Sequence, residues 1–273
     1  MIVVGEWMSV KILKNDRGVF SDISESTTLS NDIGWWNCMV AEDFDGDGDL
    51  DLVAGNLGLN YKYKASKEEP FEIFASDFDQ TGSLDIVLGY HNAGQLYPVR
   101  GRQCSSEHMP FIKKKFPSYE AFGNASIYEI YGEDNLAQSI HYKATNFSNS
   151  YFENLGEGKY KIKPLPIEAQ LSSVNSIEIM DINSDGYDDL ILMGNLLNSE
   201  VETPRNDASY GLCLLGDGTG EFRPMNISKS GLMVEGEVRS SAQIETNHGD
   251  LLIVARNNEK LKLFQINPHY SFK

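Results

Sequence analysis

The feature that most constrains the fold of this chain is an acidic segment that occurs three times. It appears as AEDFDGDGDLDLVAGN (41–56), ASDFDQTGSLDIVLGY (75–90) and IMDINSDGYDDLILMGN (179–195). Each copy has an apolar lead-in, an acidic loop with glycine at its sixth position, and an apolar strand that closes on glycine. Repeats spaced by tens of residues in a chain rich in strands and turns are typical of a propeller or a solenoid.

A second recurring unit lies between the acidic loops. It appears as VKILKNDRGVFSDIS (10–24), YFENLGEGKYKIKPL (151–165) and GLCLLGDGTGEFRPM (211–225). Each copy predicts a hairpin, because two strand-like runs flank a turn rich in Asn, Asp and Gly. An acidic-loop hairpin followed by an outer hairpin makes a four-stranded blade. The sequence therefore predicts an all-β fold, a single β-propeller over residues 1–273 with about five blades.

Three stretches depart from this rhythm. Apolar residues recur at steps of three and four over residues 101–139, which predicts a small helical insertion within a blade. Residues 244–266 resemble a blade whose acidic loop has degenerated, and IVVGEWMSV at the start resembles a strand whose acidic loop is missing. We expect the first and last blades to be incomplete, either because the two ends close the ring together or because the chain is a fragment of a longer protein. Residues 1–8 lack the pattern of a signal peptide.

The spacing of oxygen-bearing residues in the acidic loops predicts up to three Ca²⁺ sites. Position 1 is Asp43, Asp77 or Asp181, and positions 3, 5 and 9 offer further side-chain oxygens, while position 7 offers a backbone carbonyl. The predicted ligands are Asp43, Asp45, Asp47, Asp49 and Asp51 in the first loop, Asp77, Asp79, Thr81, Ser83 and Asp85 in the second, and Asp181, Asn183, Asp185, Tyr187 and Asp189 in the third.

These loops differ from EF-hands, because position 12 is Ala54, Leu88 or Leu192 instead of a bidentate glutamate. Acidic residues also decorate ordinary exposed turns, but the matching spacing in three loops favours a metal. We expect calcium to fix the hairpin turn and so to stabilise the fold. Because Thr81 replaces a carboxylate, we expect the second site to be the weakest.

Charge and composition exclude several classes of protein. The net charge is −17, from 40 acidic and 23 basic residues, and such a field repels nucleic acid. No apolar run approaches the roughly 20 residues of a membrane-spanning helix. Cys38, Cys104 and Cys213 form no metal-binding spacing, and the sequence leaves open whether two of them form a disulfide.

The segments DFDGDGDLDLVAGN, DFDQTGSLDIVLGY and DINSDGYDDLILMGN resemble FG-GAP/VCBS repeats, which also build the integrin-α β-propeller. The resemblance implies a propeller with calcium loops, but such repeats serve adhesion proteins, secreted bacterial proteins and some lyases. The stretches KYKASKEEPFEIFASDFD and YFENLGEGKYKIKPLPIEAQ are similar to the propeller portion of large secreted Bacteroidetes proteins of the ASPIC/UnbV-VCBS type. This resemblance implies an extracellular, cell-surface or periplasmic protein.

The sequence contains no nucleophile, P-loop or HExxH motif. We therefore expect the protein to be an interaction or adhesion module that binds a protein or a carbohydrate, and we do not expect it to be an enzyme. The alternative is a propeller enzyme or binder acting on polysaccharide, for which His91, Tyr97, Arg100 and Arg102 are the local candidates. Tryptophans and tyrosines near the strand ends favour packing, with an exposed aromatic platform as the other interpretation.

Overall fold

The structure, a computed structural model, describes residues 1–199, 203–247 and 249–266. The chain divides into two compact units. Unit 1 comprises Met1–Lys62 and Phe147–Lys273, and unit 2 comprises Tyr63–Asn146. Each unit is built on antiparallel sheets, as the all-β prediction requires. Within the described part of the chain, no helix is long and apolar enough to cross a membrane.

The first acidic loop belongs to a four-stranded sheet of unit 1, the β6 sheet, with the order β13-β12-β7-β6. Its strands are β6 (Cys38–Glu42), β7 (Asp51–Gly55), β12 (Ser150–Asn154) and β13 (Tyr160–Pro164). Strands β7 and β12 are direct neighbours, with Val53 opposite Tyr151, although nearly a hundred residues separate them in the chain. Unit 2 is therefore inserted between the second and third strands of a sheet.

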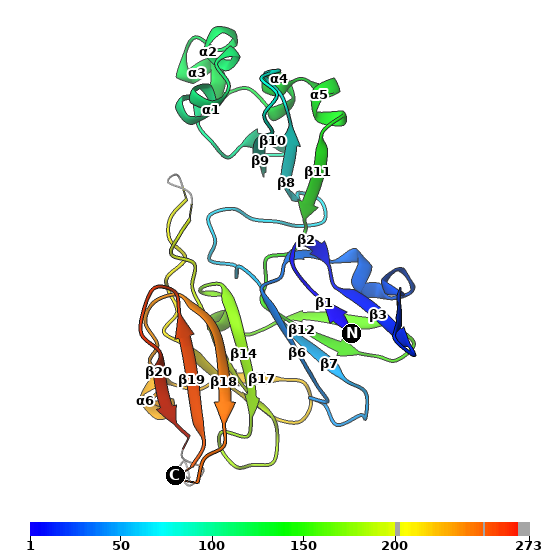
Figure 1. The fold of residues 1–273 in the computed structure, drawn as a ribbon, viewed down its shortest axis with the longest axis vertical. Coiled ribbons are helices and arrows are strands. Elements are labelled where there is room, and N and C mark those ends of the chain that lie inside the picture. Colours follow the sequence, from blue (N-terminus) through cyan, green and yellow to red (C-terminus); the bar gives the residue numbers. More distant parts are fainter. Residues whose placement is uncertain (200–202, 248, 267–273) are drawn as a thin grey trace. The chain divides into compact units, whose positions relative to one another are not determined.

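Four further sheets complete the described part of unit 1 (Figure 1). The β14 sheet contains β14 (Val174–Met180), β15 (Asp189–Gly194), β16 (Leu212–Gly216) and β17 (Phe222–Pro224), and the β18 sheet contains β18 (Val238–Ile244), β19 (Leu251–Arg256) and β20 (Lys262–Gln265). The β1 sheet contains β1 (Ile2–Val3), β3 (Lys11–Asp16) and β4 (Val19–Asp22), and β2 (Glu6–Ser9) pairs with β5 (Ile33–Trp35). Short helices η1 (Ser24–Ser26), η2 (Thr28–Asn31), η3 (Ile167–Gln170) and α6 (Ile227–Ser230) connect the strands.

The predicted outer hairpins are confirmed as β3–β4, β12–β13 and β16–β17. No closed ring of sheets is defined by the residues that the structure describes. Propeller closure, a single domain over residues 1–273 and the number of five blades therefore stay predictions.

Unit 2 contains one four-stranded sheet, the β8 sheet, with the order β10-β9-β8-β11. Its strands are β8 (Phe71–Ser76), β9 (Asp85–Asn92), β10 (Gln95–Pro98) and β11 (Ile140–Ala144). In the β6 and β14 sheets, the strand before the acidic loop lies at the edge of the sheet. In the β8 sheet, β11 pairs along the corresponding edge of β8, so the second repeat departs from the strand order of the other two.

The helices of the chain concentrate in the stretch where the sequence predicted an insertion at 101–139. They are α1 (Arg102–His108), α2 (Phe111–Lys115), α3 (Tyr119–Gly123), α4 (Ile127–Tyr131) and α5 (Glu133–Ala137). Ser126 begins α4 with a capping box that involves Glu129. Ile112, Ile127 and Ile130 are fully buried and pack with Phe74 and Val87 of the β8 sheet. The helices therefore cover one face of this sheet.

The sheets of unit 1 stack in chain order because side chains alternate between the two faces of a strand. We call the face that carries repeat positions 10 and 12 the leading face of a sheet, and the face that carries position 11 the trailing face. In the β6 sheet, Leu52 and Ala54 on the leading face pack with Val10 of the preceding N-terminal segment. Val53 on the trailing face packs with Leu190, at position 10 of the β14 sheet.

The next pair of sheets repeats this arrangement. Ile191, on the trailing face of the β14 sheet, packs with Leu252 and Val254 of β19, which define the leading face of the β18 sheet. Strand β14 accordingly lies beside both β6 and β18. Within unit 1, each contact between successive repeat sheets therefore joins a trailing face to a leading face.

The glycine that closes β7 is required by the approach of the next sheet. A Cβ atom on Gly55 would lie 2.3 Å from the carbonyl oxygen of Val174 and 2.7 Å from Sγ of Cys38. We predict that Gly55→Ala lowers the free energy of unfolding by about 3 kcal/mol, because a backbone oxygen cannot retreat from the added methyl group. Chemical denaturation measures this loss.

Gly123→Ala is the matched control, since a Cβ atom on this helical glycine meets nothing within 4 Å. The control should leave stability unchanged or raise it by up to about 1 kcal/mol. Equal stability of the two variants would contradict the close approach of the two sheets.

Candidate metal centres

The three acidic loops connect β6 to β7, β8 to β9 and β14 to β15, and they share one backbone conformation. Position 4 is left-handed in each loop, with φ of 76° at Gly46, 60° at Gln80 and 60° at Ser184. Position 6 is glycine with φ of 94° at Gly48, 85° at Gly82 and 90° at Gly186. A left-handed glycine permits the sharp turn that brings the side chains of positions 1, 3 and 5 together.

Hydrogen bonds hold the position 1 carboxylate in the same way in all three loops. The backbone N–H of position 5 donates to its Oδ1, over 3.1 Å to Asp43, 2.9 Å to Asp77 and 3.1 Å to Asp181. The N–H of position 6 donates to Oδ2, over 3.0, 2.8 and 2.9 Å respectively. The shared spacing in the sequence therefore corresponds to a shared three-dimensional loop.

Two of the loops gather carboxylate oxygens closely enough to hold a metal ion. One oxygen from each of Asp43, Asp45 and Asp47 lies within 4.8 Å of the others, and the same holds for Asp77, Asp79 and Asp85. Hard oxygen donors on a flexible loop fit a divalent cation such as Ca²⁺. In the third loop position 3 is Asn183, whose Nδ2 donates to Oδ2 of Asp185 over 2.8 Å. The donor chemistry of all three loops therefore fits a hard cation.

The position 9 carboxylate connects each loop to its sheet. Oδ2 of Asp51 accepts a hydrogen bond from the Tyr151 hydroxyl over 2.6 Å, and Oδ1 accepts one from the Asn154 backbone over 2.7 Å. Asp189 accepts from the backbone N–H groups of Ile182 and Gly216, each over 2.8 Å. Asp51 and Asp189 thus join the loop hairpin to the third strand of the sheet.

Position 9 of the second loop has a different environment. Oδ2 of Asp85 accepts a hydrogen bond from the backbone of Phe78, inside its own loop, over 3.1 Å. Asp85 belongs to the carboxylate cluster of its loop, whereas Asp51 does not belong to the cluster of the first loop. The expected weakness of the second site, which rests on Thr81, stays a prediction.

Burial and mutual repulsion make the charged loops electrostatically costly. Burial raises the pKa of Asp189 to about 6 and also raises the pKa values of Asp51 and Asp85. Burial raises the pKa of Asp45, and the charges of Asp47 and Asp43 add to the effect. A carboxyl group whose pKa is raised in the folded state stabilises the fold only while it is protonated. This stabilisation is lost as the pH rises through the raised pKa, so at neutral pH these groups oppose folding unless a cation is near.

Position 7 and the remaining predicted ligands lie on exposed parts of the loops. The side chains of Asp49, Thr81 and Ser83 are exposed, and Tyr187 is 48% exposed. Their assignment as metal ligands through backbone or hydroxyl oxygens stays a prediction.

His91, Tyr97 and Arg102, three of the four candidates for catalysis, have separate environments. His91 is opposite Leu96 and Tyr97 is opposite Tyr90, so His91 and Tyr97 point to opposite faces of the β8 sheet. The Arg102 guanidinium is buried and donates to the backbone oxygens of Phe116 and Pro117, over 2.6 and 3.2 Å. Arg102 therefore braces the helices of unit 2.

Sequence reasoning missed a carboxylate that lies between two histidines. Oε1 of Glu72 is 3.1 Å from Nε2 of His91, and Oε2 is 2.6 Å from Nε2 of His141. The His141 ring stacks on Phe74 with 4.3 Å between the ring centroids. Because the three polar residues lie on β8, β9 and β11, they tie three strands together. The available signal was a single acidic residue in the apolar run FEIFAS.

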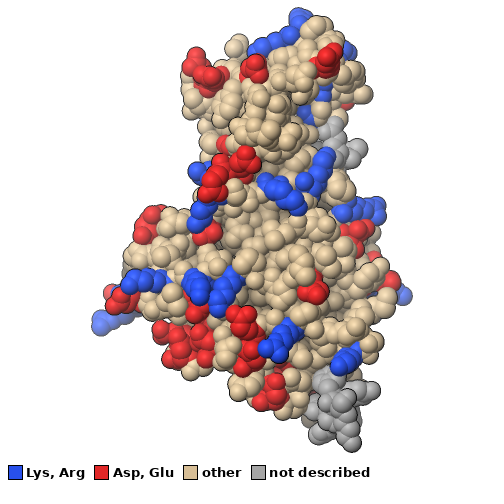
Figure 2. Space-filling view, turned by 180° about the vertical axis from the view of Figure 1, so that it is seen from behind, with Lys and Arg blue, Asp and Glu red and all other residues tan. Residues whose placement is uncertain are grey.

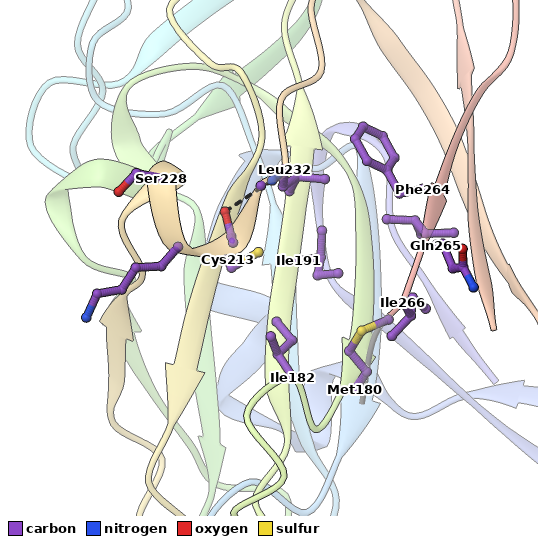
Figure 3. A pocket seen from close by; sticks show the side chains of 13 residues that line it. Met180, Ile182, Ile191, Cys213, Ser228, Leu232, Phe264, Gln265 and Ile266 are labelled. Carbon is purple, nitrogen blue, oxygen red and sulfur yellow. Dashed lines mark hydrogen bonds between the residues drawn. The ribbon is translucent and has the colours of Figure 1, made fainter. Parts of the chain in front are cut away.

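A cavity of about 420 Å³ lies between the β14 and β18 sheets (Figure 3). Its walls mix apolar and polar groups, with Met180, Ile191 and Phe264 directed toward it and residues of α6 at its rim. Burial raises the pKa of Cys213 in this wall to about 11, so its thiol stays protonated and weakly nucleophilic. All three cysteines of the chain are free thiols. The cavity offers neither an acid–base pair nor a metal site.

Comparison with known families identifies part of the chain. A family model described as an FG-GAP-like repeat matches residues 1–54, which include the β1 sheet and the first acidic loop. A search of curated proteins found no match. The FG-GAP resemblance predicted from the sequence is confirmed, and the resemblance to large secreted Bacteroidetes proteins stays a prediction.

We predict that Asp51→Ala destabilises the protein even in the presence of a chelator. The variant leaves the Tyr151 hydroxyl and the Asn154 N–H without their acceptor, which should lower the free energy of unfolding by about 3 kcal/mol. Asp49→Ala, two residues away on the exposed part of the loop, should change it by less than about 0.5 kcal/mol. Urea denaturation in EDTA measures both values, and equal stabilities would show that Asp51 does not brace β12.

Proposed function

We propose that this FG-GAP repeat protein is a calcium-stabilised interaction module that acts outside the cytoplasm. The observation that supports it most directly is the recurrence of one loop conformation at three hairpins, with clustered carboxylate oxygens in two of them. Loops that share both donor spacing and backbone geometry are better explained by a common ligand than by the general preference of turns for acidic residues.

Calcium suits these loops better than magnesium. The donors are carboxylate, amide, hydroxyl and carbonyl oxygens on a flexible backbone, whereas Mg²⁺ demands a tight octahedron and retains several waters. Asp43, Asp45 and Asp47 would hold the ion in the first loop, Asp77, Asp79 and Asp85 in the second, and Asp181, Asn183 and Asp185 in the third. Bound calcium would supply positive charge between carboxylates that otherwise repel one another.

The proposed role of the ion is structural. Each loop joins two strands of a sheet, and in the first and third loops the position 9 carboxylate extends that connection to a third strand. An ion that binds the folded loop more tightly than the unfolded chain stabilises the fold by mass action. We further propose that the sheets of unit 1 are blades of a β-propeller, since they follow one another face to face in chain order.

We propose binding in place of catalysis because the candidate catalytic groups serve the fold. Arg102 braces helices, and His91 and Tyr97 lie on opposite faces of their sheet. A surface of mixed charge with acidic patches and uncharged areas, seen in Figure 2, suits recognition of a protein or carbohydrate partner. Because FG-GAP repeats are typically extracellular, the match of residues 1–54 to this repeat supports a proposed extracellular, cell-surface or periplasmic location.

Calcium should raise the melting temperature of the chelator-treated protein. One site filled at about 100 times its Kd adds about 2.7 kcal/mol to the free energy of unfolding. Isothermal titration should count up to three ions, and thermal unfolding in EDTA and in calcium measures the stabilisation. Magnesium at the same concentration should stabilise less.

Single-loop variants test whether these loops are the sites. Asp45→Asn, Asp79→Asn and Asp185→Asn should each weaken one site, whereas Asp134→Asn on α5, outside the loops, should leave calcium binding unchanged. Identical melting curves in calcium and EDTA, with no titratable ion, would falsify the proposed calcium sites.

A second candidate function is the binding of a polysaccharide, and the geometry of Trp7 favours it. Trp7 has φ of 59° at an irregularity in the pairing of β2 with β5, an uncommon conformation for a bulky residue. Its ring centroid lies 5.2 Å from that of Trp35, and both side chains are half-buried. Trp7→Ala should reduce retention on a polysaccharide panel in affinity electrophoresis, while Tyr210→Ala should not. Unchanged retention of Trp7→Ala, or no retention of the parent protein, would contradict this candidate.

A further inference from the structure

The β8 sheet of unit 2 presents an apolar face that is covered at one end only. Tyr63 packs there on Phe71 and Tyr90, with 5.4 and 5.0 Å between the ring centroids, whereas no helix or strand of unit 2 covers the other end. This leading face carries Ile86 and Leu88 at repeat positions 10 and 12. Strand pairing places Ile140, Ala75 and Ile86 in one row and Tyr142, Ile73 and Leu88 in the next. Ile86 is 51% exposed, Ile140 54% and Tyr142 56%. In the β6 and β14 sheets the same repeat positions are almost completely buried.

The trailing face of the β8 sheet is covered by helices of unit 2. Val87 at position 11 and Phe74 on β8 pack against Ile112, Ile127 and Ile130 of the helices. The helices thus occupy the trailing face, where unit 1 places the following sheet. Unit 2 therefore leaves its leading face open, and in unit 1 a leading face packs against the preceding sheet.

The β18 sheet leaves the complementary face open among the described residues. Its leading face packs against the β14 sheet through Leu252 and Val254. On the trailing face, Ala242, Ile253 and Leu263 form one row across the three strands. Leu263 is 59% exposed and Ile244, on the same face, is 44% exposed.

The paired strand residues of the two open faces carry no charged side chain, and the charged Arg239 of β18 lies at the pairing irregularity between Val238 and Ser240. The strand residues of the leading face are Phe71, Ile73, Ala75, Ile86, Leu88, Tyr90, Gln95, Tyr97, Ile140, Tyr142 and Ala144, and those of the trailing face are Ser240, Ala242, Ile244, Leu251, Ile253, Ala255, Leu263 and Gln265. In a chain with 23% charged residues and a net charge of −17, two uncharged sheet faces are unexpected of surface that stays in water. Apolar patches with depleted charge mark interaction sites.

We propose that the chain associates with a second copy of itself, head to tail. The trailing face of the β18 sheet in one copy packs on the leading face of the β8 sheet in the next. This pairing of faces follows the pattern within unit 1, where a trailing face packs on a leading face at both contacts between successive repeat sheets. A second copy of the chain supplies a trailing face of this kind. Such a contact uses two different patches, so it forms rings if its rotation closes and open chains if it does not. The inference depends on the sheet faces and not on calcium.

Sedimentation velocity of the whole chain from about 1 to about 100 µM, in saturating calcium, tests the proposal. The parent protein should form dimers and larger species as concentration rises. Tyr142→Lys, on the leading face, and Leu263→Lys, on the trailing face, should each weaken association by at least about tenfold. Tyr128→Lys on α4 and Ile167→Lys on η3 are matched controls that remove exposed apolar residues outside the two faces, and they should associate like the parent.

Mixing the two variants separates head-to-tail packing from other modes. Each variant retains one intact face, so an equimolar mixture of Tyr142→Lys and Leu263→Lys should form a one-to-one dimer that does not extend. Self-pairing through one face would be weakened by only one variant, and that result overturns the proposal. A parent protein that stays monomeric at every concentration overturns it as well. Tyr142→Ser and Leu263→Ser replace the lysine variants if circular dichroism shows that the latter do not fold.

Discussion

The alternation of side chains along a β-strand is the constraint on which the rest of this structure depends. Positions 10 and 12 of the repeat fall on one face of a sheet and position 11 on the other. An apolar run of three residues therefore gives the sheet two apolar faces. A sheet of this kind cannot remain alone in water. In unit 1 the β6 and β14 sheets are each covered on both faces, by the preceding segment and by the following sheet, through Leu52, Val53, Leu190 and Ile191. In unit 2 helices cover one face in place of a sheet.

The acidic loops place a second demand on the same sheets. Their conformation brings like charges together, which opposes folding, while their hydrogen bonds connect the loop to the strands that the apolar faces hold in place. Asp51 shows both effects, because burial raises its pKa and yet its two oxygens orient Tyr151 and Asn154. A bound cation would reduce the first effect without disturbing the second. We therefore propose that metal binding and sheet assembly reinforce each other at these loops.

The sequence predicted what local patterns determine. Glycine at position 6, the outer hairpins and the apolar strands that close on Gly55 and Gly194 follow from turn chemistry and period-two alternation, and the structure confirms them. The insertion of unit 2 between β7 and β12 was not predicted, because pairing across nearly a hundred residues leaves no local signature. The pairing of β11 along β8 was not predicted either, because it also leaves no local signature in the sequence. Glu72 could not be matched with His91 and His141 until three strands placed them side by side.

We propose that the loops beginning at Asp43, Asp77 and Asp181 each hold calcium in the folded protein. Anomalous X-ray diffraction from crystals grown in calcium is the decisive measurement, because data collected at wavelengths with strong and weak calcium scattering identify the element and its position. We expect an anomalous peak among the oxygens of positions 1, 3 and 5 in each loop, with the first loop's peak beside Asp43, Asp45 and Asp47. Crystals that diffract well in saturating calcium but show no anomalous peak at any of the three loops would refute the proposed calcium sites.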